Sequence, residues 1–501
     1  MKTSSSELYD LIKTMSENER SGFIERYSQT SSSPDYLKLF KAYAAQKKFD
    51  EERIKKHLEL KNFERIKIYL HKNLLSYLSM LSNEGVEQEI MNMISVGNVL
   101  AERLLVQQSL AIFKKARKLA LKKEYLHYVL ILDQKIHHHE TGLLNQEHAD
   151  HFRFKYKKEG FDPLIKRLEI ELESEIYLLN RRLFSQKNST LMRSKEARKE
   201  LKNTFENYVK AGEHPLMTFN ARIKFYIVSA YYYQQLNEFD KAIYFFQKSV
   251  YAFENENPNP TENYNNYAVA YHNLMFTYSR VKNLEGVRSV LDKLYVMKPR
   301  TKTHRTVIMQ SYVTYESNYC KYVYDYALRK KRLAEIERYF LNNKTNIHKQ
   351  LYLQTCINLS VNYFIDKKFK KALEILQHVS EYESMDYYKD MVNVMKVYRL
   401  IIYMEMEKMD LLSFAVRNTY RHMLKHMQYF EFEKVVIETL KRIILTNSVK
   451  EQNKILMNAA DKFKDLKKSP DTAQVFLIFN FSGWIDCKVR NKEYYDLMNI
   501  D

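Results

Sequence analysis

The chain has 501 residues, of which 81 are Lys or Arg and 61 are Asp or Glu, and its formal net charge is +20. It holds only 8 glycines and 7 prolines, which excludes collagen-like, linker-rich and glycine-loop proteins. The same shortage argues against sheet-rich folds, because their tight turns need positive φ angles. The 40 tyrosines and 27 phenylalanines beside one tryptophan predict an aromatic interior. The composition therefore predicts an all-α fold.

Cysteine usage and hydropathy bear on the compartment. The three cysteines stand far apart in no paired spacing, which indicates neither a zinc site nor a disulfide framework and favours a reducing compartment. The first residues are polar and charged, without the apolar run of a signal peptide. The most apolar stretch, residues 475–479, is far shorter than the ~20 residues of a membrane helix. We therefore expect a cytoplasmic protein without membrane insertion.

In chain order, residues 1–60 predict an N-terminal helical cap, in which Ser16 and Glu19 have the spacing of a capping box. Residues 61–210 predict irregular helical repeats, because apolar residues recur three and four apart. Residues 211–385 hold the clearest repeats, and residues 386–501 predict further helical repeats and a C-terminal cap. Two prolines in residues 254–261 predict a loop there.

The repeat pattern places small residues where two helices approach closely and large side chains around them. Three copies occur between residues 220 and 382, and a weaker fourth lies near residue 100. The four copies contain, in the order just given, Ala230, Tyr233, Phe239, Ala242, Phe246 and Ser249; Tyr271, Leu274, Tyr278, Leu284, Val287, Leu291, Leu294 and Pro299; Leu359, Ser360, Tyr363, Phe369, Ala372, Leu376 and Val379; and Val96, Gly97, Leu100, Val106, Ser109, Phe113 and Ala116.

This pattern resembles the tetratricopeptide repeat (TPR), and the resemblance implies an α-solenoid of stacked antiparallel helix pairs in a right-handed superhelix. The second copy departs from the family, with Met275 and Val287 where smaller residues are preferred. The spacing of the copies leaves room for a degenerate helix pair around residues 301–345. A looser resemblance to long bacterial TPR-containing proteins, in residues 8–13 and 417–434, implies no activity.

In TPR proteins the first helix of each pair lines a concave groove that receives a peptide. The resemblance implies that Tyr231 and Phe276 occupy equivalent sites in this groove, and that the third repeat offers an apolar surface. The alternative is that these side chains pack against neighbouring helices. The peptide-binding residues implied by the resemblance are Lys224, Tyr231, Gln234, His272, Phe276 and Arg280.

Candidate chemistry is sparse. His137, His138, His139 and Glu140, followed by His148 and His151, are metal-ligand residue types, but consecutive helical residues point about 100° apart. A solvated junction is the better interpretation. The sequence holds no phosphate-binding glycine loop, zinc-protease motif or nucleophile elbow. We therefore expect no enzyme activity, no metal and no cofactor.

Basic runs recur at residues 114–118, 155–158, 181–203, 329–332 and 367–371. They could neutralise phosphates, although cations also favour the last turns of helices without any ligand. We expect a scaffold or adaptor that binds a protein or peptide partner. One alternative is a helical-repeat signalling or transcriptional regulator, which a DNA-binding helix pair within residues 1–60 would favour. The other is association with RNA or another nucleic acid through the basic faces.

Overall fold

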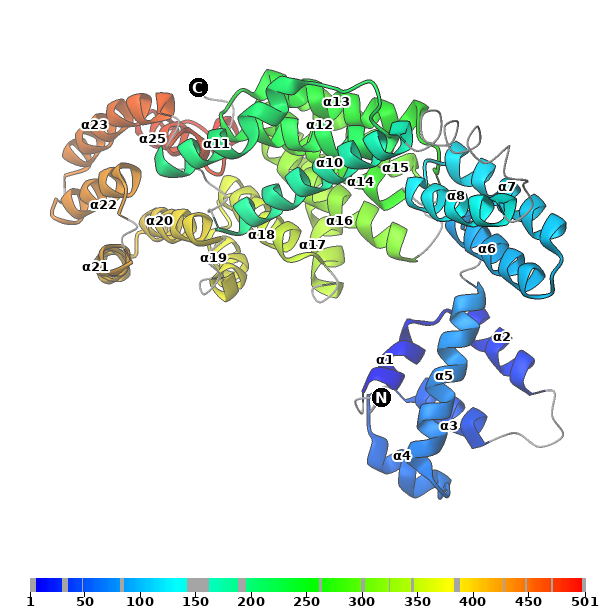
Figure 1. Ribbon diagram of the computed structural model, residues 1–501. Coiled ribbons are helices and arrows are strands. Elements are labelled where there is room, and N and C mark those ends of the chain that lie inside the picture. Colours follow the sequence, from blue (N-terminus) through cyan, green and yellow to red (C-terminus); the bar gives the residue numbers. More distant parts are fainter. Residues whose placement is uncertain are drawn as a thin grey trace. The chain divides into compact units, whose positions relative to one another are not determined.

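The computed structural model describes most of the chain, and all elements of the described residues are helices, with no strand (Figure 1). The chain divides into two compact units, residues 1–143 and 144–501, and each is described here by itself. The described residues are 6–28, 35–46, 48–81, 85–141, 162–187, 195–260, 264–298, 302–323, 325–343, 347–382, 388–426, 429–446, 448–469 and 472–497.

The first unit begins with short helices around one apolar cluster. The predicted capping box is confirmed: the hydroxyl of Ser16 accepts from the backbone N–H of Glu19, whose carboxylate accepts from the N–H of Ser16 at 2.6 Å. The cluster extends from Leu8 to Tyr77, so the boundary expected at residue 60 falls within it. The helices of this unit are α1 (Glu7–Thr14), α2 (Glu17–Tyr27), α3 (Asp35–Ala45), α4 (Glu51–Leu58), α5 (Phe63–Leu81), α6 (Val86–Glu102), α7 (Val106–Lys122) and α8 (Leu126–Thr141).

Small residues let α6 and α7 approach closely. A Cβ atom on Gly97 would lie 2.3 Å from the ring of Phe113, so only glycine fits this contact without a shift. Across the same contact, the hydroxyl of Ser109 donates to the carbonyl of Gly97 at 2.8 Å. The small residues of the repeat pattern therefore lie where two helices touch.

The second unit contains the remaining helices, and consecutive helices pack in adjacent pairs (Figure 1). They are α10 (Asp162–Lys187), α11 (Lys195–Ala211), α12 (Phe219–Gln235), α13 (Phe239–Asn255), α14 (Tyr264–Arg280), α15 (Leu284–Val296), α16 (Lys302–Tyr319), α17 (Tyr326–Asn342), α18 (Lys349–Ile365), α19 (Phe369–Gln377), α20 (Lys389–Glu405), α21 (Met409–Lys425), α22 (Glu431–Ile444), α23 (Val449–Lys468), α24 (Ala473–Phe476) and α25 (Phe481–Val489), with 3-10 turns η2 (Cys320–Tyr322), η4 (His378–Tyr382) and η6 (Tyr494–Asp496).

One three-residue turn recurs in both units. Its middle residue has φ between 54° and 64°, and the next N–H donates over 2.8–3.2 Å to the carbonyl five residues earlier. This geometry is the Schellman motif, which satisfies carbonyls at a helix end and reverses the chain. The turn joins α6 to α7, α7 to α8, α12 to α13, α14 to α15, α18 to α19 and α20 to α21, with Leu104, Glu124, Asn237, Lys282, Lys367 and Glu407 as its middle residues.

The pair α16 and α17 occupies the interval left between the second and third copies, and its turn is different. Helix α16 runs into η2, whose residues Cys320, Lys321 and Tyr322 are all buried. Lys321 is only 2% exposed. The longer turn therefore carries a lysine into the interior of the second unit.

The C-terminal segment, residues 472–497, packs back onto earlier helices. The ring of Phe479 lies 5.1 Å from that of Phe364 on α18 and 4.6 Å from that of Tyr398 on α20. At its beginning, the amide of Gln474 donates to the side chain of Asn237, in the turn after α12, at 3.1 Å. Residues far apart in sequence thus meet inside this unit.

Three further features concern the predictions above. The three cysteines, Cys320, Cys356 and Cys487, are buried. Residues 256–260 form part of the expected loop between α13 and α14. Among the described residues, no helix has both the length and the apolar character needed to cross a membrane.

Candidate functional site

The three predicted site residues on α12 mostly contact the chain itself. Tyr231 is 8% exposed, and its hydroxyl accepts from Ser185 of α10 at 3.0 Å. Lys224 forms an ion pair with Glu175 of α10 at 2.7 Å. Gln234 donates to the hydroxyl of Thr277 on α14 at 3.0 Å. Helix α10 therefore covers the face of α12 that carries Tyr231 and Lys224.

The three predicted site residues on α14 do not share one environment. The guanidinium of Arg280 lies over the ring of Phe276, 4.8 Å from its centroid, and both side chains border a cavity. His272 bonds through Nε2 to the hydroxyl of Tyr315 on α16 at 3.3 Å. Burial lowers the pKa of His272 to about 4, so its ring is neutral near pH 7. The structure thus brings Phe276 and Arg280 to one cavity and places Tyr231 in a separate contact with α10.

The apolar face of the third repeat is covered. Phe364 of α18 is fully buried, and its ring stacks on that of Tyr494 with centroids 5.4 Å apart. On α20, Glu405 accepts from the indole N–H of Trp484 at 2.9 Å and pairs with Lys488 at 2.9 Å. The C-terminal segment therefore covers part of the α18 face on which an apolar ligand surface was expected, and it also contacts α20.

The cavity that Phe276 and Arg280 line is bordered by α14, α16, η2, α18, α20 and the C-terminal segment, and it is partly open to solvent. Its volume is about 80 Å³, room for a few water molecules or one small anion. Its lining includes two cations and several amides and hydroxyls, but no carboxylate among the described residues. The lining residues are Phe276, Ser279, Arg280, Thr314, Tyr315, Asn318, Lys321, Gln354, Ile357, Asn358, Met391, Leu477 and Ile478.

The two cations of this cavity, Arg280 and Lys321, repel each other. Burial, and then the charge of Arg280, lower the pKa of Lys321 to about 7. Burial also lowers the pKa of Arg280 to about 10. Lys321 has no hydrogen bond or ion pair to a described residue, and Nη1 of Arg280 is buried without a hydrogen-bond partner there. Two like charges thus share a confined space without a counterion from the described chain.

Cations of the basic runs are, by contrast, often paired. In the run 329–332, Arg329 pairs with Asp366, and Arg332 pairs with Glu316 at 2.7 Å. In other runs Arg117 pairs with Asp133, and Lys371 pairs with Glu337 at 2.7 Å. The run 155–158 lies outside the described residues. Several basic positions thus stabilise contacts between helices.

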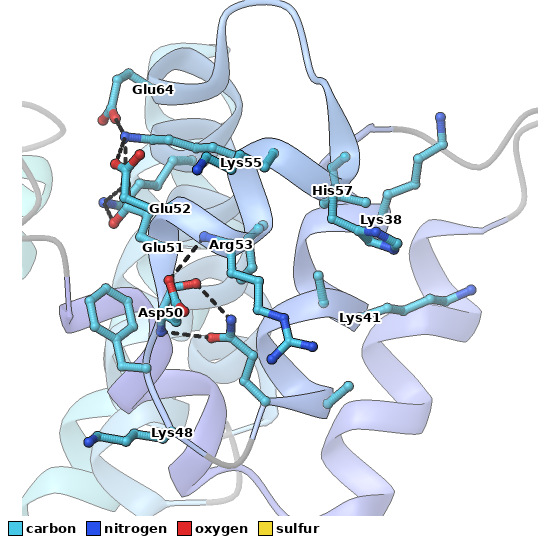
Figure 2. A pocket seen from close by; sticks show the side chains of 18 residues that line it. Lys38, Lys41, Lys48, Asp50, Glu51, Glu52, Arg53, Lys55, His57 and Glu64 are labelled. Carbon is cyan, nitrogen blue, oxygen red and sulfur yellow. Dashed lines mark hydrogen bonds and ion pairs between the residues drawn. The ribbon is translucent and has the colours of Figure 1, made fainter.

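An open hollow of about 2040 Å³ lies between α3, α4 and α5 of the first unit. Figure 2 shows Lys55 among Glu51, Glu52 and Glu64, with ion-pair distances of 3.5, 3.5 and 3.6 Å. The hollow is also lined by the exposed cations Lys38, Lys41, Lys48, Arg53 and Lys56.

The histidine-rich segment is only partly described, because His148 and His151 lie outside the described residues. The ring of His139 stacks on Phe113, and burial lowers the pKa of His139. Glu140 forms an ion pair with Lys114 at 2.5 Å. In the part of the chain that the structure describes, no three His, Cys, Asp or Glu side chains lie close enough to hold a metal ion.

Comparisons of the chain with family models, with curated proteins and with solved structures gave no match. The described chain is all-helical, with helices in adjacent pairs, and two cations line one cavity of its second unit. Sequence reasoning found Arg280 but missed Lys321. The available signal was the run of residues 319–323, Tyr-Cys-Lys-Tyr-Val, in which the lysine is the one charged residue.

Proposed function

We propose that this chain is a non-enzymatic, cytoplasmic scaffold or adaptor, built as a TPR-like right-handed solenoid, that binds a protein or peptide segment. The observation that carries the proposal is the C-terminal segment lying across α18 and α20. Its aromatic side chains occupy faces that the repeat resemblance assigns to a ligand. A helix face that accepts a segment of its own chain has the shape and apolar character to accept one from a partner.

The recurring turn supports the solenoid part of the proposal. The same Schellman geometry ends the first helix in all four copies found by sequence, and it also joins α7 to α8 and α20 to α21. Equal turns between helices of similar length produce equal pair geometry, and stacking of equal pairs is how helical-repeat proteins build binding surfaces. A right-handed superhelix is the arrangement that such stacking gives in TPR proteins.

An exposed apolar stripe on α10 offers a second surface of the right kind. Leu172, Ile176, Leu179 and Leu183 are all exposed and recur at intervals of four, three and four residues. This spacing aligns side chains along one face of a helix. Such a stripe favours an amphipathic partner helix over a small-molecule substrate.

Site-specific photo-crosslinking in cells tests the proposal. A photoreactive benzoylphenylalanine replaces Phe276, which is partly exposed beside the cavity, or Tyr295, which is 75% exposed on α15. We expect position 276 to yield a discrete cross-linked protein, identified by mass spectrometry, and position 295 to yield none.

A further benzoylphenylalanine at Leu179 tests the α10 stripe in the same way. Circular dichroism of each purified variant confirms that the fold is retained before cross-linking is interpreted. Cross-links of equal pattern and yield at positions 276, 179 and 295, or none at 276 and 179, would contradict a partner-binding role for these surfaces.

The hollow of the first unit favours a second candidate, association with nucleic acid. Lys41, Arg53 and Lys56 are exposed there, and their side chains have no ion pair to a described residue. Phosphate binding releases counterions, so affinity must fall steeply as salt rises. We expect K41Q/R53Q to weaken binding of a single-stranded RNA oligonucleotide and to reduce its salt dependence, measured by fluorescence anisotropy. If these substitutions leave RNA binding unchanged, the hollow is not the surface that binds RNA.

A further inference from the structure

We propose that the cavity between α14, η2 and α18 is a binding site for one small oxyanion, a carboxylate or a phosphate, held by Arg280 and Lys321. This inference does not depend on a protein partner, since every residue it uses lies within the second unit.

The first argument is charge. Arg280 and Lys321 line the same cavity, and no carboxylate lines it among the described residues. Asp325, the acidic residue nearest to Lys321 in sequence, accepts instead from the backbone N–H of Leu328 at 2.9 Å. Glu316 is 2% exposed and is held elsewhere by Arg332 at 2.7 Å and Arg288 at 3.4 Å. A buried charge without a partner is strongly unfavourable, and an anion between the two cations removes that cost.

The second argument is that the cations are held in place by the fold. Helix α14 ends at Arg280, and the guanidinium is fixed over Phe276. Lys321 lies in the buried turn η2, whose backbone cannot move outward without exposing Cys320 and Tyr322. The site is therefore preorganised, which lowers the entropic cost of binding.

The third argument is the supply of hydrogen-bond donors. Nη1 of Arg280 is buried without a hydrogen-bond partner among the described residues, and so is Oε1 of Gln354. A half-turn of the Gln354 amide would present its N–H₂ group to the cavity instead. A guanidinium, an ammonium and an amide match the acceptor oxygens of one carboxylate or phosphate group.

The size of the cavity sets the class of ligand. A volume of about 80 Å³ accepts a single anionic group. Leu477 and Ile478 of the C-terminal segment form an apolar part of the wall. Their low polarity strengthens the attraction between the bound anion and both cations.

Isothermal titration calorimetry on the full chain tests the site, with sodium sulfate, phosphate and acetate as separate probes and sodium chloride as the ionic-strength control. The variants are Arg280→Gln and Lys321→Met. Lys330→Gln is the matched control, because it removes one positive charge from the exposed face of α17. Since hydrogen bonds to charged groups are strong, we expect each site variant to weaken binding by about tenfold or more.

Preference for acetate identifies a carboxylate site, and preference for sulfate and phosphate identifies a site for tetrahedral anions. Thermal unfolding without added anion is the second readout: removal of an uncompensated charge in Lys321→Met should leave the melting temperature unchanged or raise it. The proposal is overturned if no probe binds beyond the chloride control, if all variants bind like the wild type, or if Lys321→Met lowers the melting temperature without anion, since a structural role would then explain the lysine.

Discussion

Two groups of cations in the second unit differ in one respect. Arg329 and Arg332 on α17 meet the carboxylates of Asp366 and Glu316. Arg280 and Lys321 share a cavity that no described carboxylate lines. Folding alone explains the first group, because each charge is compensated within the chain. The second group adds an electrostatic cost to folding, and such a cost is retained where a ligand supplies the missing charge.

The largest loss of stability is expected when the ion pair between Arg329 and Asp366 is broken. Asp366→Asn leaves the guanidinium of Arg329, which is 1% exposed, without its carboxylate. Removing one partner of a buried ion pair costs about 3–5 kcal/mol, so the free energy of unfolding in urea should fall by that amount. A loss below about 0.5 kcal/mol, the scale of a surface substitution, would show that this pair does not compensate a buried charge.

A smaller loss is expected for Glu316→Gln. Its partners Arg288 and Arg332 have side chains that are 33% and 23% exposed, so both can turn toward water when the carboxylate is removed. We expect the free energy of unfolding to fall by about 1–3 kcal/mol. A loss larger than that of Asp366→Asn would contradict this account, because the loss of unfolding free energy would then not depend on how far the arginine is exposed to solvent.

Lys321 should respond to pH in the opposite sense to a lysine in an ion pair, whose pKa is raised by folding. The folded-state pKa of Lys321 is lowered to about 7 from 10.5, so the unfolded chain binds more protons between these values. Stability relative to Lys321→Met should therefore rise with pH in this window, by about 1 kcal/mol per pH unit. The groups that line the cavity around Lys321 are Arg280 and Tyr315, with the amides of Asn318, Gln354 and Asn358.

Urea denaturation of wild type and Lys321→Met at pH 7.5 and 8.5 measures this difference. The variant is the proper reference because the pKa values of Cys320 and Cys487 are raised by burial and change stability above pH 9 in both proteins. A difference that stays constant with pH would mean that Lys321 keeps an ordinary pKa, and the two cation groups would then not differ as described.

The smallest effect is expected for Lys330→Gln. This residue belongs to the same basic run as Arg329 and Arg332, but it is exposed. We expect a change in unfolding free energy within about 0.5 kcal/mol, measured in the same urea titration. A larger loss would mean that membership of the run, rather than burial, decides which cations matter.

Sequence patterns predicted the all-α fold, and the helix pairs with small residues at their contacts could be located. The pair α20 and α21 has the same turn but was not singled out, because Leu400 and Leu412 stand where Ser360 and Ala372 stand in the third copy. The pattern that can be recognised in the sequence is the small residues that a close helix contact requires, and the turn itself does not require them.

The site was less accessible to sequence reasoning. Arg280 was found through the repeat frame, whereas Lys321 lies in η2, a turn that departs from the recurring one. Helix α10 covers Tyr231 through a contact with Ser185, which is 46 residues away in sequence. The spacing within a repeat gives no information on such a contact. Contacts between helices far apart in sequence thus decided which predicted site residues reach a cavity.

The most direct test of the anion site is the proton uptake that accompanies sulfate binding at pH 7. Calorimetry in two buffers with different heats of ionisation measures this uptake, and sulfate itself does not titrate near pH 7. Because Lys321 has a pKa of about 7, binding should draw about half a proton into the wild type and none into Lys321→Met. Sulfate binding without proton uptake, or equal uptake in both proteins, would contradict a site built on an uncompensated buried lysine.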